Sequence, residues 1–164
     1  MNRYIPVTIP TATNLGYPES IDSTPQSIGA ALHSGKELIH MAVEQHTILC
    51  VDDEPVGLEV RRMLLERAGY KVFTALDGAA GLEIFAREPI EAVVLDFSMP
   101  GMNGGEVAGS MRDVKPHIPI LMLSAYTSLP AEVHALVNLT MTKGEGAPAL
   151  LRNLGSLVDG DASQ

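Results

Sequence analysis

The sequence predicts an α/β fold in which helices cover both faces of a doubly wound parallel sheet, giving three layers. Two observations carry this prediction. Between residues 46 and 158, short apolar runs alternate with helical patterns, as is typical of parallel strands joined by helical crossovers. The run of residues 92–95 is uniformly apolar and rich in β-branched side chains, which suits a strand that is buried on both faces. We therefore expect five strands and five helices around one sheet.

The expected elements alternate in chain order. The first strand is the apolar run 47–51, and the helix 55–68 follows it, with Gly69 as a natural end. The other strands are expected at residues 71–75, 92–95, 118–123 and 139–142. The other helices are expected at residues 79–87, near 106–114, near 131–137 and at 148–158. No second core remains for an output domain, so we expect a stand-alone domain.

The segments outside this alternation are expected to be accessory. Residues 1–44 would form an N-terminal extension that is largely disordered, because its first part is rich in Pro, Thr, Ser, Asn and Gly. Helical spacing of apolar residues allows a short helix over residues 28–43. The predicted domain covers residues 46–158, and residues 159–164 would be a C-terminal tail.

Charge and composition disfavour several classes of partner. Eleven Lys+Arg against twenty Asp+Glu give a formal charge of -9, which disfavours binding to nucleic acid or to an anionic membrane surface. The N-terminus lacks the pattern of a signal peptide, and no apolar run approaches the length of a membrane span. With Cys50 as the single cysteine, no intrachain disulfide can form. We expect a cytoplasmic protein.

Polar side chains follow four of the predicted strands. The first strand is followed by Asp52 and Asp53, the third by Asp96, the fourth by Ser124 and the fifth by Lys143. Ligands bind at the carboxyl ends of such strands, so these residues should converge on one edge of the sheet. Grouped carboxylates repel one another unless a cation neutralises them. Mg²⁺ fits this set because it prefers a few oxygen ligands and retains waters.

Asp96 is the predicted nucleophile of this edge. An aspartate can form an acyl phosphate when a metal and a cation disperse the charge of the transferring phosphoryl group. Lys143 would pair with a carboxylate at rest and with a phosphoryl oxygen afterwards. Ser124 would donate its hydroxyl to the same oxygens.

The motifs around these residues resemble a known family. They are Val51-Asp52-Asp53-Glu54, Leu95-Asp96 with Met99-Pro100-Gly101-Met102-Asn103-Gly104, Leu123-Ser124-Ala125, and Lys143. Their order and spacing resemble the receiver domain of bacterial two-component response regulators, as in CheY-like proteins, over residues 46–158. The resemblance implies the flavodoxin-like fold with strand order 2-1-3-4-5.

The resemblance also implies roles and partners. Asp52, Asp53 and Asp96 would hold Mg²⁺ together with the backbone carbonyl of Ser98, with Asp53 as the more direct ligand of the acidic pair. A sensor histidine kinase or a phosphotransfer protein would phosphorylate Asp96 from a phosphohistidine. An unknown downstream protein would respond to the change in surface, and neither nucleic acid nor a membrane would be a partner.

The fifth strand departs from the family pattern at two positions. Thr140 stands where the family usually has Tyr or Phe, and Gly144 stands where it usually has Pro. These departures favour one alternative, a receiver-like binding module that acts without phosphorylation, although the intact acidic set disfavours it. A second alternative is an aspartyl-phosphate phosphohydrolase, which usually needs an Asp where this chain has Ser98. We expect a signalling domain with at most weak autophosphatase activity rather than an enzyme.

Overall fold

The structure is a computed structural model and describes residues 45–160 of the chain. The predicted extension 1–44, with its helix over 28–43, lies outside the described residues, as do the last four residues of the predicted tail. The division of the chain at these points therefore stays a prediction. Within residues 45–160, no helix is both long and apolar enough to cross a bilayer.

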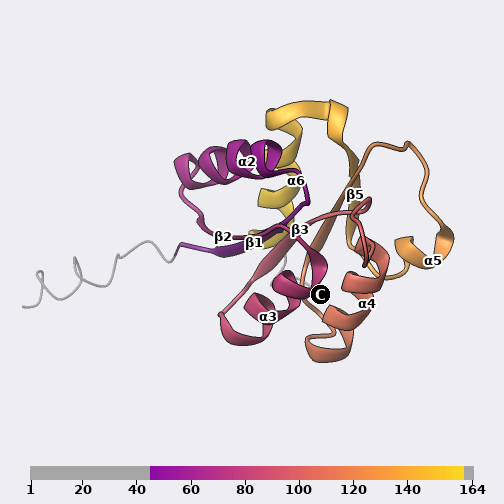
Figure 1. The fold of residues 1–164 in the computed structure, drawn as a ribbon. Helices are drawn as coiled ribbons and strands as arrows, with labels where there is room; N and C mark the ends of the chain where they lie inside the picture. The colour runs from indigo at the N-terminus through magenta and orange to yellow at the C-terminus, as the bar shows by residue number, and fades with distance from the viewer. Residues whose placement is uncertain (1–44, 161–164) are drawn as a thin grey trace, which may run out of the picture. The chain divides into compact units, whose positions relative to one another are not determined.

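Five parallel strands form one sheet in the order β2-β1-β3-β4-β5, which confirms the predicted topology (Figure 1). Their bounds are β1 Thr47–Val51, β2 Lys71–Ala75, β3 Ala92–Asp96, β4 Ile120–Ser124 and β5 Leu139–Thr142. The order reverses direction between β1 and β3, so the chain winds outward from the centre of the sheet in both directions. This is the switch point at which doubly wound sheets bind ligands.

Helices cover both faces of the sheet (Figure 1). Their bounds are α2 Pro55–Arg67, α3 Gly78–Arg87, α4 Gly104–Val114, α5 Ala131–His134 and α6 Gly146–Val158, with a short 3₁₀ helix, η1, at Lys143–Glu145. α2 and α6 pack on one face, and α3, α4 and α5 pack on the other. The three predicted layers are thus confirmed.

β1 shows how the sheet divides its side chains between two cores. Ile48 and Cys50 pack with the helices α2 and α6, whereas Leu49 and Val51 pack with α3 and α4. All four side chains are fully buried, because successive residues of a strand point to opposite faces and both faces are covered. Burial raises the pKa of the Cys50 thiol to about 12, so this cysteine is a packed core residue.

The largest difference from the expected elements is α5, which has only four residues and ends at His134 instead of continuing to residue 137. The chain returns to the sheet at once, since the Asn138 N–H donates to the Ile120 carbonyl at 2.9 Å. Arg112 of α4 donates to the Leu136 carbonyl and to the Asn138 side chain, and these bonds hold residues 136–138 against α4. β4 also begins later than expected, at Ile120, after a proline that has no N–H for the ladder.

Candidate functional site

The structure brings the predicted polar residues together at the carboxyl edge of the sheet. Asp96 is the last residue of β3, and Ser124 is the last residue of β4 beside it. Asp52 follows β1 directly, and its N–H continues the ladder by donating to the Ala75 carbonyl at 3.1 Å. Lys143 follows the last residue of β5. The parallel register therefore places residues that are far apart in the sequence around one point.

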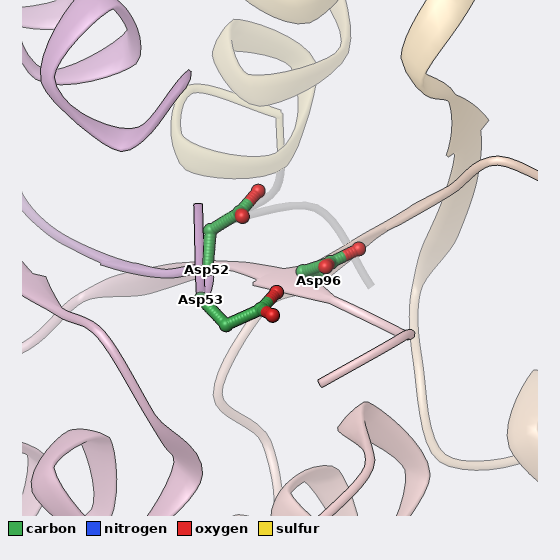
Figure 2. A group of neighbouring side chains, drawn as sticks. All are labelled: Asp52, Asp53 and Asp96. Atoms are coloured by element: carbon green, nitrogen blue, oxygen red, sulfur yellow. The ribbon is translucent and has the colours of Figure 1, made fainter. Parts of the chain in front are cut away.

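Three carboxylates meet at the centre of this edge (Figure 2). One oxygen from each of Asp52, Asp53 and Asp96 lies within 4.8 Å of the others. Asp52 and Asp96 are buried, with exposed fractions of 0% and 1%, whereas Asp53 is exposed. Solvent therefore screens the charges of the two buried carboxylates only weakly, whereas it can reach the carboxylate of Asp53.

Lys143 joins two of the carboxylates. Its Nζ lies 3.1 Å from Asp52 Oδ2 and 3.1 Å from Asp96 Oδ2. The turn that carries Lys143 is closed by Thr142 and Glu145, because the Thr142 N–H and hydroxyl both donate to Glu145 Oε1, at 2.8 and 3.0 Å. This closed turn fixes the point at which the Lys143 side chain starts.

The two buried aspartates have different protonation tendencies. Burial raises the pKa of the Asp96 carboxyl above its usual value, since the Lys143 charge that opposes the rise does not cancel burial and the Asp52 charge. For Asp52, burial acts in the same direction but is outweighed. The Glu54 N–H and the charges of Arg61 and Lys143 hold the pKa of Asp52 below its usual value. The pKa of Lys143 is raised because its two carboxylates outweigh its own burial.

The arrangement fits a divalent cation. Asp96 Oδ1 is buried and has no hydrogen-bond partner among the described residues, and a buried carboxylate oxygen without a partner is costly unless a ligand satisfies it. The Asp96 carboxylate that carries this oxygen belongs to the group of three carboxylates described above, and hard oxygen ligands of this kind suit Mg²⁺. The oxygen chemistry and the orphaned atom therefore agree with the predicted metal.

Two predicted residues have less direct evidence. The Ser124 hydroxyl oxygen is buried and accepts a hydrogen bond from the Tyr126 N–H at 2.9 Å, so its donor role toward a phosphoryl oxygen stays a prediction. Ser98 lies in the exposed part of the loop after β3, and its carbonyl as a metal ligand also stays a prediction.

Arg61 is a residue of this site that sequence reasoning missed. It lies on α2, and its Nη2 donates to Asp52 Oδ2 at 2.9 Å. A signal was available in the sequence. Leu58, Arg61 and Leu65 occupy positions i, i+3 and i+7 of the helix, and both leucines are buried. A charged residue on the apolar face of a helix needs a partner of opposite charge.

One family matches this chain. The response regulator receiver domain family matches residues 48–143, a span that runs from β1 to Lys143 and includes all the strand ends described above. The chain belongs to the response regulator receiver domain family. This confirms the resemblance inferred from the motifs, and the receiver domain is the part of response regulators that histidine kinases phosphorylate.

Curated relatives of this receiver domain are longer proteins. The transcriptional regulatory protein KdpE of Mycobacterium tuberculosis is 39% identical over 89 residues, which is 54% of this chain and 39% of KdpE. The transcriptional regulatory protein GlrR of Escherichia coli is 36% identical over 88 residues, which is 54% of this chain and 20% of GlrR. The sensor histidine kinase GacS of Pseudomonas protegens is 33% identical over 116 residues, 68% of this chain and 12% of the kinase. The chain thus spans between about an eighth and two fifths of these relatives.

Solved structures match over nearly their whole length. The response regulator TrrA from Thermotoga maritima, solved in complex with Mg²⁺-BeF, is 32% identical with a TM-score of 0.66 and is covered to 99%, against 69% of this chain. The chemotaxis protein CheY4 of Vibrio cholerae is 29% identical with a TM-score of 0.66, covering 69% of this chain and 98% of CheY4. Receiver domains bind Mg²⁺ at an acidic pocket, and the group of three carboxylates in this chain is consistent with such a pocket.

Proposed function

We propose that this receiver domain accepts a phosphoryl group on Asp96 in a Mg²⁺-dependent reaction and signals through a changed protein interaction. One observation carries the proposal. The Asp96 carboxylate is buried between an acidic pair and Lys143, with one oxygen bound to the lysine and the other without a partner among the described residues. The free oxygen has lone pairs for a cation or for a phosphorus atom.

In the proposed reaction, an Asp96 oxygen attacks the phosphorus of a phosphohistidine on a sensor histidine kinase or a phosphotransfer protein. The new O–P bond forms as the N–P bond breaks, and the electron pair of the N–P bond returns to the imidazole nitrogen. Asp52, Asp53, Asp96 and the Ser98 carbonyl would hold Mg²⁺, whose charge would offset that of the carboxylates and the phosphoryl oxygens.

The other residues of the edge act on the phosphoryl oxygens. Lys143 already lies against Asp96 Oδ2, so a small movement of its ammonium follows the oxygens of the new group. Ser124 would rotate its hydroxyl toward the same oxygens and so change its contact with the Tyr126 N–H. Phosphorylation replaces the single negative charge of the Asp96 carboxylate with about two on the phosphoryl group. A partner protein, whose identity stays open, would recognise the resulting surface.

Incubation with acetyl phosphate and Mg²⁺, followed by intact mass spectrometry, tests this function. The wild type should gain one phosphoryl group, and Asp96→Ala should gain none. Asp113→Ala is the matched control, since Asp113 is an exposed aspartate on α4, and it should react like the wild type. An adduct that survives in Asp96→Ala would contradict the proposal. Absence of any adduct would instead favour a binding module that acts without phosphorylation.

A further inference from the structure

Arg61 reaches the edge of the sheet from the inner side of α2. Its side chain is 12% exposed, and its Nη2 lies 2.9 Å from Asp52 Oδ2. Side chains of a helix lean toward its N-terminus, so Arg61 leans over Gly57, one turn earlier, toward the point where β1 ends. A Cβ atom at Gly57 would lie 3.7 Å from Arg61 Nη2. This is an ordinary van der Waals distance, so the guanidinium passes close to Gly57 without depending on the absence of a side chain there.

The two cations of the site are not equivalent. Lys143 contacts both Asp52 and Asp96, each at 3.1 Å, whereas the single ion pair of Arg61 among the described residues is with Asp52. Asp52 Oδ2 therefore has two positively charged neighbours, and Asp96 has one that it shares. If Lys143 follows a phosphoryl group on Asp96, the buried Asp52 still retains Arg61 and the Glu54 N–H, which donates to Oδ1 at 2.9 Å.

We propose that Arg61 is a positioning residue that keeps Asp52 paired, so that Lys143 is free to act on the phosphoryl group of Asp96. The inference rests on the proposed function and adds a second cation to its site. An arginine suits this task, because its guanidinium stays charged and binds a carboxylate in a fixed direction. Its charge also reduces the negative potential that attracts Mg²⁺ to the three carboxylates.

Loss of the Arg61 charge should therefore have two opposite effects. Mg²⁺ should bind more tightly, because one positive charge beside its ligands is gone. Phosphoryl acceptance at saturating Mg²⁺ should be slower, because Asp52 would hold Lys143 more strongly and the lysine would stabilise the transferring group less. A merely structural role would not separate the two effects, since a loosened site would bind Mg²⁺ more weakly and react more slowly.

Arg61→Gln is the informative variant because glutamine can still donate a hydrogen bond to Asp52 but carries no charge. Arg62→Gln is the matched control, since Arg62 is the next residue of α2 and pairs with Glu59 and Glu66 on the surface. Calorimetric titration of the unphosphorylated proteins with Mg²⁺ should show roughly three- to tenfold tighter binding for Arg61→Gln. The rate with acetyl phosphate at saturating Mg²⁺ should fall roughly threefold or more. Arg62→Gln should match the wild type in both.

Arg61→Lys separates charge from side-chain identity. It keeps the positive charge and should restore both values to within about twofold of the wild type. Unchanged values in Arg61→Gln, or weaker Mg²⁺ binding together with slower reaction, would overturn the proposal. If Arg61→Gln fails to fold by circular dichroism, loss of both properties in a folded Arg61→Lys would also overturn it. A wild type that takes no phosphoryl group would refute the proposed function, and the Mg²⁺ titrations would still decide the role of Arg61.

Discussion

Asp52 and Asp96 are close neighbours with opposite electrostatic surroundings. Asp52 has three donors, namely the Glu54 N–H, Arg61 and Lys143, so its charge is stabilised despite full burial. Asp96 shares Lys143, faces the charge of Asp52 and has one oxygen without a partner among the described residues. The charge of Asp52 therefore stabilises the site, whereas the charge of Asp96 destabilises the resting fold unless a cation binds beside it.

Substitution of each aspartate by asparagine should change stability in opposite directions. Asp96→Asn should raise the free energy of unfolding by about 1 kcal/mol in Mg²⁺-free buffer near neutral pH, because a carboxylate with a raised pKa is removed. Asp52→Asn should lower it by roughly 2–3 kcal/mol, because Arg61 and Lys143 lose a buried partner. Urea unfolding followed by circular dichroism measures both. Changes of the same sign would contradict the assignment.

The pH dependence of these differences provides an internal control. A raised folded pKa means that ionised Asp96 disfavours folding, so the gain in Asp96→Asn is full above that pKa and vanishes as the pH falls toward the unfolded value of about 4. A lowered folded pKa means that Asp52 contributes stability above about pH 4 and loses it as the pH falls through the folded pKa. As the pH is lowered, the extra stability of Asp96→Asn over the wild type should therefore disappear before the stability that Asp52 contributes is lost.

Sequence reasoning identified the site residues that directly follow or end strands. Asp52, Asp96, Ser124 and Lys143 could be found because parallel strands bring their carboxyl ends to one edge whatever the details of packing. Arg61 lies within a helix, and its role depends on how α2 is rotated over the sheet. Helical periodicity marks it as facing inward, but the partner that it meets there is set by tertiary packing.

At the scale of elements, the first residue of α4 lies against the end of β3, where Asp96 is located. Its first residue, Gly104, donates its N–H to the Phe97 carbonyl at 2.9 Å. A Cβ atom at Gly104 would lie 2.3 Å from the Asp96 carbonyl oxygen and 2.8 Å from the Phe97 Cα. These are backbone atoms, so they cannot move aside by a change of rotamer. The absence of a side chain at this position allows the helix to begin against the end of β3.

Gly104→Ala should therefore cost about 2 kcal/mol of unfolding free energy and slow phosphoryl acceptance, because the end of β3 must shift. Gly144→Ala is the matched control, since nothing lies within 4 Å of a Cβ atom there, and it should change stability by less than about 0.5 kcal/mol. Urea unfolding and the acetyl phosphate reaction measure the two effects. A Gly104→Ala protein as stable as Gly144→Ala would show that the backbone around Asp96 adapts without cost.

The predicted strands agree with the structure both in the centre and at the two edges of the sheet, apart from the later start of β4, and the clearest difference lies in the helix α5. β1 and β3 have strong apolar runs with helices on both faces, and their positions agree with the prediction to within one residue. Before β5, the short segment between Ser124 and Lys143 suggested a trimmed helix near residues 131–137, and α5 is shorter still, with four residues. Two contacts between distant segments follow this helix. The Ile120 N–H donates to the Asn138 side chain, and Arg112 donates to the Leu136 carbonyl. Local periodicity contains no information about such contacts.

For the molecule as a whole, the two helical layers hold the sheet so that one edge gathers three carboxylates and two cations. The side chains of Asp52 and Asp96 are buried at this edge, and Asp53 is the exposed member of the three. Asp53 has no ion-pair partner among residues 45–160, unlike Asp52 and Asp96. The Asp53 carboxylate is therefore available to attract a cation, and no ion pair among residues 45–160 gives it a role in stabilising the metal-free fold.

Mg²⁺ should accordingly stabilise the protein, and Asp53 should be needed for this stabilisation but not for the stability of the Mg²⁺-free protein. A ligand that binds the folded state at a hundredfold excess over its Kd adds about 2.7 kcal/mol to the free energy of unfolding. Asp53→Asn should leave the stability of the Mg²⁺-free protein within about 0.5 kcal/mol of the wild type and abolish most of this gain. Thermal unfolding with and without Mg²⁺ measures both, and Glu132→Gln, an exposed acid on α5, is the control. Equal Mg²⁺ stabilisation of the wild type and Asp53→Asn would exclude Asp53 as a ligand, because the cation would then be held without its carboxylate.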